Sequence, residues 1–583
     1  MQTHLGKAIP IGIILIFFYL AVSSLVDDSP AMDEQNHLGR GVAYLNSGDP
    51  RLNVEHPPLV NLLAALPTGL LDLDIPLNEP SWQERKPPET FWYAFAETLF
   101  WERQNPVEQM IFLGRLPIVI LTISLGMLAY LIGNRLWEKP AGLIAMAGIL
   151  FDPNIITNGR YITTDLGGTF FILLATVTVV YSFKQTTVRQ MTDNGMAKIR
   201  HSLPLLLLTA LTIGLAFGAK LTSILFIPIW IVLAFVSYGQ KSYARGVAQR
   251  ILFLAGAGLL SLFVLWGIYR FEWGHFLFIS DGMMPYNRFQ GPMPTFWSGI
   301  ERIADLSGSG SGRDAFLLGE FSPVGFWHYF PVAFSAKTPL VTLIALPLAI
   351  LLLAANQTTR RRLLCLLIPA VGYFLLAMNS SLNIGYRHLL PILPFCYLII
   401  AGGISAIREQ PAVNSQPSTN NNQRLTIYRL LLTIFCFLLL TTSLTIHPHY
   451  ISFFNQLYGG PSNGYKVLID SNLDWGQDLK RLEWWMFENG VTEINLAWYG
   501  SSDPSQLNIN HQPIPGFPRP EFLPLWWDVP FDRNNPPPGV YAISPYNYWE
   551  MPLRPEDKTV YAWFRSREPD DRIGYSIFIY IVE

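Results

Sequence analysis

The chain has 583 residues, of which 50% are hydrophobic and 14% charged, with a mean hydropathy of +0.27 and a formal net charge of −2. Globular proteins average about 25% charged residues, so this composition excludes an ordinary water-soluble protein and indicates an integral membrane protein. Cys365, Cys396 and Cys436 lie in apolar runs without paired spacing. They fit packing roles and argue against a disulfide framework or a zinc site.

The N-terminal apolar run from Ala8 to Val26 follows Lys7, and no clear small-residue cleavage site comes after it. We therefore interpret it as a retained first helix and not as a removed signal peptide. About 20 apolar residues at a rise of 1.5 Å span a hydrocarbon core of about 30 Å. On that basis we predict about eleven spans, near residues 8–26, 112–134, 139–152, 165–183, 203–218, 221–238, 251–269, 338–355, 363–378, 390–406 and 428–446.

Alternate loops between these spans are short and basic, and Lys7 lies on the same side as they do. The positive-inside rule then places the N-terminus in the cytoplasm, and an odd number of spans places the C-terminus outside. We expect a multi-pass protein of the plasma (inner) membrane with three long segments on its outer face: 27–111, about 270–337, and 447–583.

The predicted organisation is a transmembrane module over residues 1–446 and an extracytoplasmic α/β domain over 447–583. In the second, strands are expected at 466–470, 493–499, 540–544 and 575–582, with a helix at 477–489. Gly308 to Gly312, beside Asp281 to Pro285 in the second outer segment, is typical of a mobile loop, and the polar stretch 411–423 of a flexible cytoplasmic connector.

The first outer segment opens with Asp33-Glu34-Gln35-Asn36-His37, shortly after the first span. Placing charged side chains beside a bilayer costs free energy. Ser29-Pro30 supplies an N-cap and a first-turn proline, so we expect a helix to start there with both acids in its first turn. Two interpretations remain open from these residues alone: an amphipathic helix on the membrane surface whose acids complement the helix dipole, or a functional carboxylate site.

Further ionisable residues lie at the outer ends of predicted spans. Any one of them is more often an interfacial residue than a ligand. Together they face the same side as Asp33, and several Arg and Lys around one or two carboxylates suit an anionic head group, with an acid available as base. They are Arg115, the segment Arg160 to Asp165, Lys220, Lys337, and Arg387-His388.

Asp33-Glu34 followed by His56-Pro57-Pro58-Leu59 resembles the first-loop pattern of protein O-mannosyltransferases. These belong to glycosyltransferase family 39 in the GT-C superfamily, which also includes the aminoarabinose transferases that act on lipid A. The segment Arg160 to Asp165 resembles the family's Arg-to-Asp segment after the third span, and the resemblance covers roughly residues 8–400. The tail segment Asp470 to Asp478 is similar to tails of prokaryotic relatives, without an implied role.

The resemblance implies transfer of a sugar from a polyprenyl-phosphate donor to a hydroxyl acceptor on the outer face, with inversion. Asp33 would be the general base and Glu34 its support or an acceptor contact, while Asp165 would orient the acceptor or a basic residue. Cations would stabilise the leaving phosphate, from the set Arg160, Arg387, Lys220, Arg115 and His388. His56, Pro57 and Pro58 would shape the loop.

Several points stay open at this stage. Asp33, Glu34 and Asp165 offer three carboxylates to Mg²⁺ or Mn²⁺, so a metal is left undecided. Eukaryotic O-mannosyltransferases carry a trefoil-like domain for which the loop at 270–337 is too short, so the acceptor can be a protein, a lipid or a glycan.

A transporter would place charges at the bilayer midplane, often with inverted repeats, which are not visible here. A lipid-linked phosphotransferase is the other alternative, while a membrane-anchored binding protein would need only one or two spans.

Overall fold

The computed structural model describes residues 2–83, 91–188, 195–236, 243–277, 285–308, 314–409, 419–516, 531–553 and 559–583. The expected mobile loop at 308–312, the segment 281–285 and the expected connector at 411–423 lie largely outside these ranges. The three cysteines are free thiols, in keeping with packing roles.

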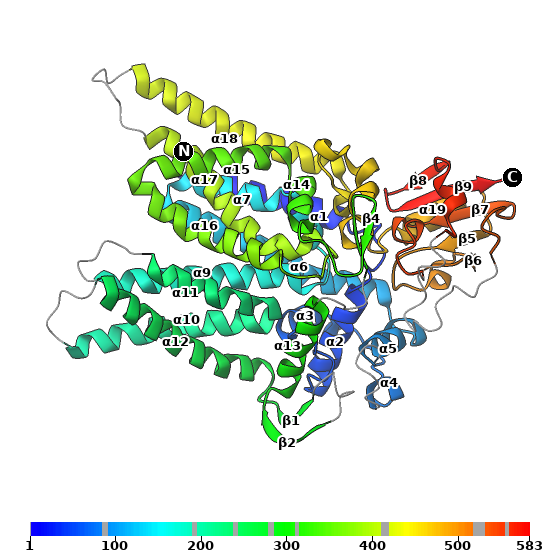
Figure 1. Ribbon diagram of the computed structural model, residues 1–583, viewed down its shortest axis with the longest axis horizontal. Coiled ribbons are helices and arrows are strands. Elements are labelled where there is room, and N and C mark those ends of the chain that lie inside the picture. Colours follow the sequence, from blue (N-terminus) through cyan, green and yellow to red (C-terminus); the bar gives the residue numbers. More distant parts are fainter. Residues whose placement is uncertain are drawn as a thin grey trace.

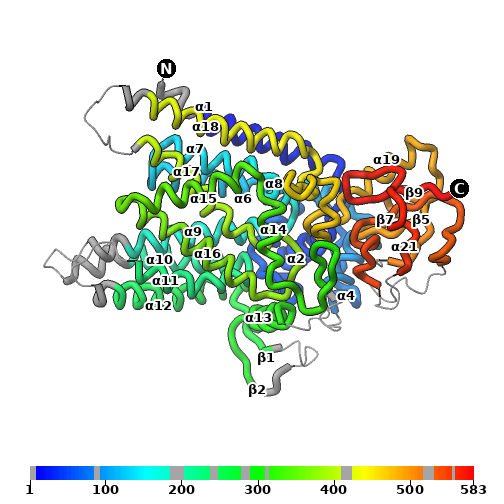
Figure 2. The backbone as a smooth tube through the Cα atoms, turned by 45° about the horizontal axis from the view of Figure 1, so that its top comes forward, coloured from blue at the N-terminus to red at the C-terminus, as the bar shows by residue number. Residues whose placement is uncertain are grey.

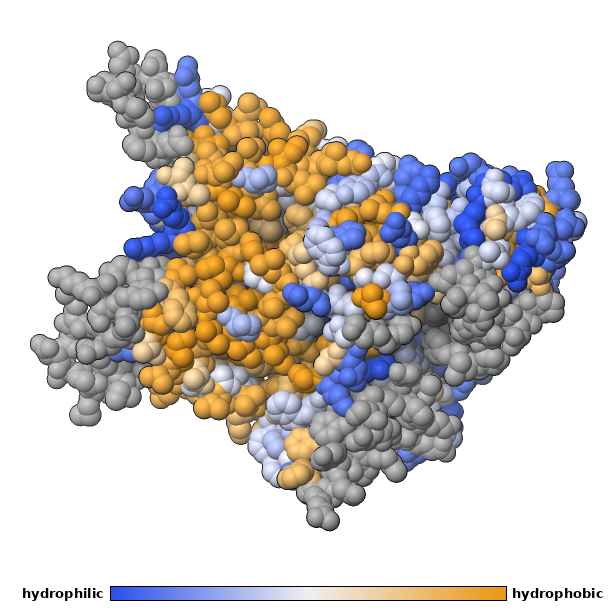
Figure 3. Space-filling view, in the orientation of Figure 1, coloured by the Kyte–Doolittle hydropathy of each residue, from blue (hydrophilic) through white to orange (hydrophobic). Residues whose placement is uncertain are grey.

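A bundle of long, roughly aligned helices forms the body of the molecule (Figure 1). The face of the bundle in Figure 3 is largely apolar, and the prediction of a mainly helical, multi-pass membrane protein is confirmed. The bundle helices are α1 (Gln2–Ser23), α6 (Val107–Leu136), α7 (Lys139–Leu150), α9 (Thr164–Val188), α10 (Gly195–Ala219), η4 (Leu221–Leu225) with α11 (Phe226–Phe235), α12 (Tyr243–Ile268), α15 (Leu340–Ala355), α16 (Gln357–Ala377), α17 (Leu393–Glu409) and α18 (Thr419–Ile446).

Among the described residues, five helices are long and apolar enough to cross a membrane. A sixth span results if α14 (Tyr329–Lys337) and α15, which meet at 110°, are counted as one. Shorter apolar helices include Ala8–Ser23, Lys139–Leu150, Leu203–Ala219 and Leu221–Phe235. Each predicted span coincides with one of the bundle helices, while the number of about eleven crossings stays a prediction.

The short helices and hairpins between the bundle helices gather at the end of the bundle that carries the C-terminus, called the polar end below, and the N-terminus lies at the opposite end (Figures 1 and 2). They comprise α2 (Glu34–Ser47), α3 (Pro58–Ala65), η1 (Leu66–Leu70), α4 (Pro80–Gln83), α5 (Phe91–Glu97), the π-turn η2 (Thr98–Glu102), α8 (Pro153–Asn158) and α13 (Pro294–Ser307). Two hairpins join them, β1 (Trp273–Leu277) with β2 (Pro285–Pro292), and β3 (Ala315–Leu317) with β4 (Glu320–Ser322).

Helix α2 is buried along its length from Glu34 to Tyr44, so the interpretation as a helix lying on the membrane surface is wrong. It packs so closely on α3 that a Cβ at Gly41 would lie 2.1 Å from the carbonyl oxygen of Asn61. Only glycine permits that approach. The helix also starts later than expected, at Glu34, because Ser29 and Pro30 bond to the C-terminal region instead.

The C-terminal region ends in a five-stranded mixed sheet of order β6-β5-β7-β9-β8. Its strands are β5 (Ile494–Ala497), β6 (His511–Pro513), β7 (Gly539–Ile543), β8 (Asp571–Ile573) and β9 (Ile577–Val582). They match the expected strands at 493–499, 540–544 and 575–582. The expected helix at 477–489 is α19 (Leu479–Glu488), which packs its Leu479 and Leu482 against the sheet.

The expected strand at 466–470 is wrong, because the chain forms two 3₁₀ turns there, η9 (Pro461–Lys466) and η10 (Asp470–Asn472). Asp470 has a φ of +60°, which turns the backbone where a strand would extend it. The apolar residues that indicated a strand, such as Leu468, are instead buried against the helical bundle.

One continuous hydrophobic core joins the bundle to the start of the C-terminal region. The same cluster contains Leu389 beside α17 and both Phe453 and Phe454 after α18. The segment that follows the last bundle helix is therefore packed on the bundle, not tethered to it.

Candidate active site

A cavity of about 520 Å³ lies at the polar end of the bundle. One part of its wall is polar, from Asp33, His56, Asp165, Lys220, Arg387 and His388. The rest is largely apolar, from η4, α13 and α16, including Leu221, Ile224, Leu225, Ile300, Leu376 and Ala377. A charged pocket with an apolar extension suits a ligand that has an anionic head and a hydrocarbon tail.

Asp33 stands immediately before α2, and its side chain does not cap that helix. The carboxylate points instead to Arg387, whose Nη1 donates to Asp33 Oδ2 at 2.8 Å. The Asp33 side chain is 28% exposed, against 6% for that of Asp165. Asp33 is therefore more accessible than Asp165.

Asp165 lies in the first turn of α9, and the Lys220 ammonium donates to its Oδ1. Lys220 is in extended conformation between α10 and η4, so the break between the two helices brings a charged residue to the cavity. Arg387 Nη1 lies 3.8 Å from Asp165 Oδ2, so one guanidinium stands between the two carboxylates.

His388 follows Arg387 on η6 (Tyr386–Ile392), a 3₁₀ segment that leads into α17. Its imidazole lines the cavity, and its Nε2 is buried without a hydrogen-bond partner among the described residues. Buried polar atoms normally have a partner. The Nε2 atom is thus available to a polar ligand in the cavity.

Glu34 does not line the cavity. Its carboxylate accepts from Arg115 Nε at 2.9 Å and Nη2 at 2.6 Å, and also from the backbone N–H groups of Ala31 and Ile162. Both side chains of this ion pair are buried. The Glu34–Arg115 ion pair thus joins the segment between α1 and α6 to α6 itself and to the turn before α9, away from the cavity.

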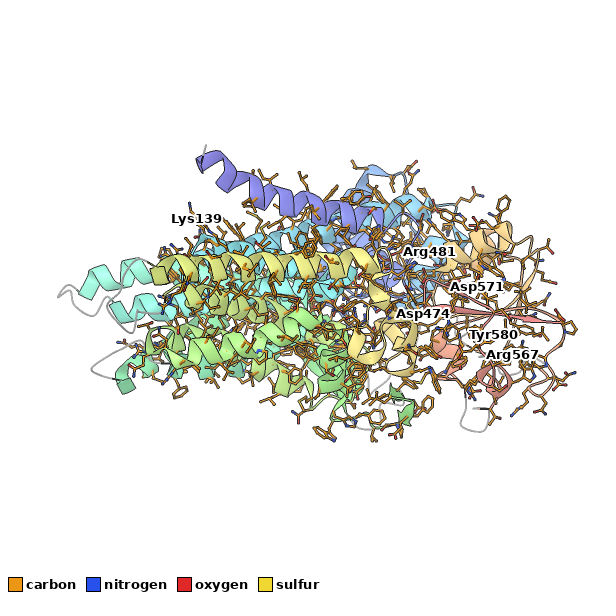
Figure 4. All side chains as sticks on the ribbon, turned by 90° about the horizontal axis from the view of Figure 1, so that it is seen from above. Lys139, Asp474, Arg481, Arg567, Asp571 and Tyr580 are labelled. Carbon is orange, nitrogen blue, oxygen red and sulfur yellow. The ribbon has the colours of Figure 1, made fainter. Side chains whose placement is uncertain are left out.

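Arg160 is also absent from the cavity wall. Its Nη1 lies 2.6 Å from Asp28 Oδ2, and Asp28 further accepts from the Tyr161 hydroxyl and pairs with Arg481. These cations hold the pKa of the Asp28 carboxyl below its usual value, although burial alone would raise it. Arg481 lies where the bundle meets the C-terminal region, whereas Lys139 lies toward the other end of the bundle (Figure 4).

His56 and His37 form a pair of imidazoles with ring centroids 4.5 Å apart. His37 Nδ1 is 2.9 Å from Asn61 Oδ1, and His56 Nδ1 is 3.2 Å from Thr164 Oγ1. Burial lowers the pKa of His37 to about 4 and that of His56 well below its usual value, with the nearby Arg40 contributing. Both rings are therefore neutral at physiological pH.

Pro57 and Pro58 lie at the start of α3, with Pro57 at the N-cap position and Pro58 as first helical residue. Proline is well suited there, because the first helical N–H has no partner within the helix. Their ring-fixed φ angles direct the chain from His56, at the cavity, into α3.

The three carboxylates considered as metal ligands do not converge. Glu34 faces Arg115, while Asp33 and Asp165 lie on either side of the Arg387 guanidinium. Among the residues that the structure describes, no group of three or more His, Cys, Asp or Glu side chains is arranged to hold a metal ion.

Sequence reasoning missed three features of this site. Glu55, next to His56, lines the cavity and pairs with Arg40 at 3.2 Å and Arg302 at 3.3 Å. Asp28 was overlooked as the partner of Arg160, although it is an acid placed directly after the first span. Trp475 lies with its ring 4.4 Å from the Arg387 guanidinium carbon, and no sequence pattern linked the two.

Residues 102–274 match the family model described as dolichyl-phosphate-mannose-protein mannosyltransferase, and this stretch includes Arg160, Asp165 and Lys220. No match was found among curated protein sequences.

The chain is also similar to three kinds of solved structure. For ArnT from Cupriavidus metallidurans in the apo state, identity is 12% over 98% of this chain and 97% of that chain, with a TM-score of 0.44. For the archaeal oligosaccharyltransferase AglB from Archaeoglobus fulgidus, identity is 12% over 91% of this chain and 62% of that chain, with a TM-score of 0.49. For the S. cerevisiae protein O-mannosyltransferase Pmt1-Pmt2 complex, identity is 9% over 75% of this chain and 89% of that chain, with a TM-score of 0.48. The family match over residues 102–274, which contains the segment Arg160 to Asp165, confirms the resemblance to protein mannosyltransferases.

Proposed function

We propose that this chain transfers a sugar from a polyprenyl-phosphate donor to a hydroxyl acceptor, with Asp33 as the general base. The observation that carries this proposal is the cavity itself. Its polar wall sets an accessible carboxylate beside two cations, and its remaining wall is apolar. The family match over residues 102–274 supports the same class of reaction.

In this mechanism the donor phosphate binds among Lys220, Arg387 and His388. Lys220 and Arg387 are already paired with Asp165 and Asp33, so the site is close to neutral before the donor arrives. A donor phosphate that draws Arg387 toward itself weakens the hydrogen bond to Asp33 and frees that carboxylate to accept a proton. Donor binding and activation of the base are then coupled through one guanidinium.

The transfer step is a single displacement. Asp33 takes the proton from the acceptor hydroxyl as its oxygen attacks the anomeric carbon. The bond from that carbon to the phosphate oxygen breaks, and the electron pair leaves with the polyprenyl phosphate, whose growing charge the cations stabilise. Attack on the side opposite the leaving group inverts the anomeric centre.

The apolar wall provides a place for the first prenyl units of the donor. Leu221 and Ile224 of η4 face this part of the cavity together with Leu376 and Ala377 of α16. A prenyl chain that moves from the bilayer to this wall stays in an apolar environment, so the wall acts through its fit to the chain and adds little hydrophobic free energy. We place the site on the outer side of the plasma membrane, as the distribution of basic loops indicates.

The test uses purified protein in lipid nanodiscs with labelled polyprenyl-phosphate sugars and an extract of envelope lipids, glycans and proteins as acceptors. Wild-type protein is expected to transfer label, and Asp33→Ala to abolish transfer while eluting as folded protein. Asp27→Ala is the matched control, since Asp27 lies in the same segment but not in the cavity wall. Full transfer by Asp33→Ala would refute the assignment of the base.

A further inference from the structure

The segment Ser471–Gln477 of the C-terminal region contacts the chain on both sides of the Asp33–Arg387 ion pair. On the Arg387 side, the Ser471 hydroxyl donates to the carbonyl oxygen of Ile384 at 2.8 Å. Asn472 Oδ1 accepts from the backbone N–H of Tyr386, also at 2.8 Å. These two bonds fix the backbone directly before Arg387.

On the Asp33 side, the same segment holds the backbone of the first outer loop. The N–H of Met32 donates to the carbonyl oxygen of Trp475 at 2.8 Å, and the N–H of Ser29 to that of Gln477 at 2.9 Å. Met32 is the residue before Asp33. Both members of the ion pair are therefore attached to one short stretch of the C-terminal region.

Trp475 adds a direct contact with the guanidinium. Its ring centroid lies 4.4 Å from Arg387 Cζ, and the indole is buried, with its ring edge-on to that of Tyr161. A cation over the face of tryptophan is attracted by the ring quadrupole, and the attraction is stronger where water is excluded. The ring also limits the directions in which the guanidinium can move.

We propose that Trp475 is a positioning residue for the transfer reaction, and that through it the C-terminal region sets the orientation of Arg387 between Asp33 and the donor phosphate. This rests on the proposed function, in which Arg387 interacts with both Asp33 and the donor phosphate. Trp475 itself does not line the cavity. It acts on the reaction only through Arg387 and the loop that carries Asp33.

The first experiment measures steady-state transfer by Trp475→Leu, Trp475→Phe, Arg387→Lys and the double variant W475L/R387K. Loss of a buried cation–π contact worth about 2 kcal/mol predicts a fall in kcat of about tenfold to thirtyfold for W475L, with little change in acceptor KM. W475F, which keeps an aromatic face, is expected to recover much of the loss. The double variant is expected to be no more than about threefold slower than R387K, because the two residues act as one unit.

Multiplicative losses in W475L and R387K would overturn the proposal, since they would mean that Trp475 acts independently of Arg387. Trp484→Leu is the matched control: the same change in the same region, at a residue 54% exposed and outside the contact. Its kcat is expected to equal that of wild type.

A second measurement does not depend on sugar transfer. Hydrogen exchange is expected to be faster in W475L than in wild type at 29–37 and 384–388, and unchanged in W484L. Unchanged exchange at both segments in W475L would overturn the positioning role, even if wild-type protein transfers sugar. Conversely, wild-type protein inactive with every donor would refute the proposed function, while the exchange data would still decide whether Trp475 orders the two segments.

Discussion

Replacing each of the adjacent acids Asp33 and Glu34 by its amide is expected to have different effects. Glu34→Gln should lower the stability of the protein, whereas Asp33→Asn should lower its transfer activity. Glu34 accepts two hydrogen bonds from Arg115 and one each from the N–H groups of Ala31 and Ile162. In Glu34→Gln the Arg115 charge stays buried without its counter-ion. Removing one partner of a buried ion pair costs about 3–5 kcal/mol, which is a large part of the stability of a typical folded protein.

Asp33→Asn removes a carboxylate that is 28% exposed and next to the cavity, so solvent screens the lost ion pair. The expected cost in stability is about 1 kcal/mol or less. Transfer activity is expected to fall by about 10²- to 10⁴-fold, the usual contribution of a positioned general base.

The assay pairs heating followed by size-exclusion chromatography with the sugar-transfer measurement on unheated protein. Glu34→Gln should lose its monodisperse peak at a clearly lower temperature than wild type, and Asp33→Asn at nearly the wild-type temperature. A Glu34→Gln variant as heat-stable as wild type would refute the reasoning, as would an Asp33→Asn variant that transfers sugar normally.

Three other outcomes are expected. In His388→Ala the free Nε2 is lost, and donor KM should rise about tenfold in the transfer assay without a change in thermal stability. In Ala377→Phe the added ring fills the apolar part of the cavity, so KM should rise for long-chain polyprenyl donors and stay unchanged for donors with a short prenyl chain. The depressed pKa of His37, about 4, means that the unfolded chain binds a proton which the folded state excludes between about pH 6.5 and 4. Wild-type stability should therefore fall as the pH falls through that window, and His37→Gln should lose less stability over the same window.

The sequence predicted the helical bundle well, because a run of about 20 apolar residues has few alternatives in a membrane. It also placed Asp33, Asp165, Lys220 and Arg387 at the same end, and the structure brings these four side chains to one cavity. Their common end followed from counting crossings, which needs no knowledge of side-chain contacts.

What the sequence could not provide was the partner of each arginine. Arg115 and Arg160 occupy the same kind of position as Arg387, at the polar end of the bundle, yet they pair with buried Glu34 and Asp28. Which acid each cation meets depends on packing between distant segments. The surface-helix interpretation of α2 failed for a similar reason, since its polar residues are buried by groups far away in the chain, such as Arg115.

The ion pair between Asp33 and Arg387 joins residues 354 positions apart, and Trp475 lies a further stretch along the chain. During synthesis the cavity therefore cannot form until the chain has been made as far as Arg387 and His388, after most of the bundle helices. A partly made chain carries Asp33 without its cation and offers no complete site for a lipid donor. The proposed transfer therefore requires a chain made at least as far as η6, and the proposed role of Trp475 requires the C-terminal region as well.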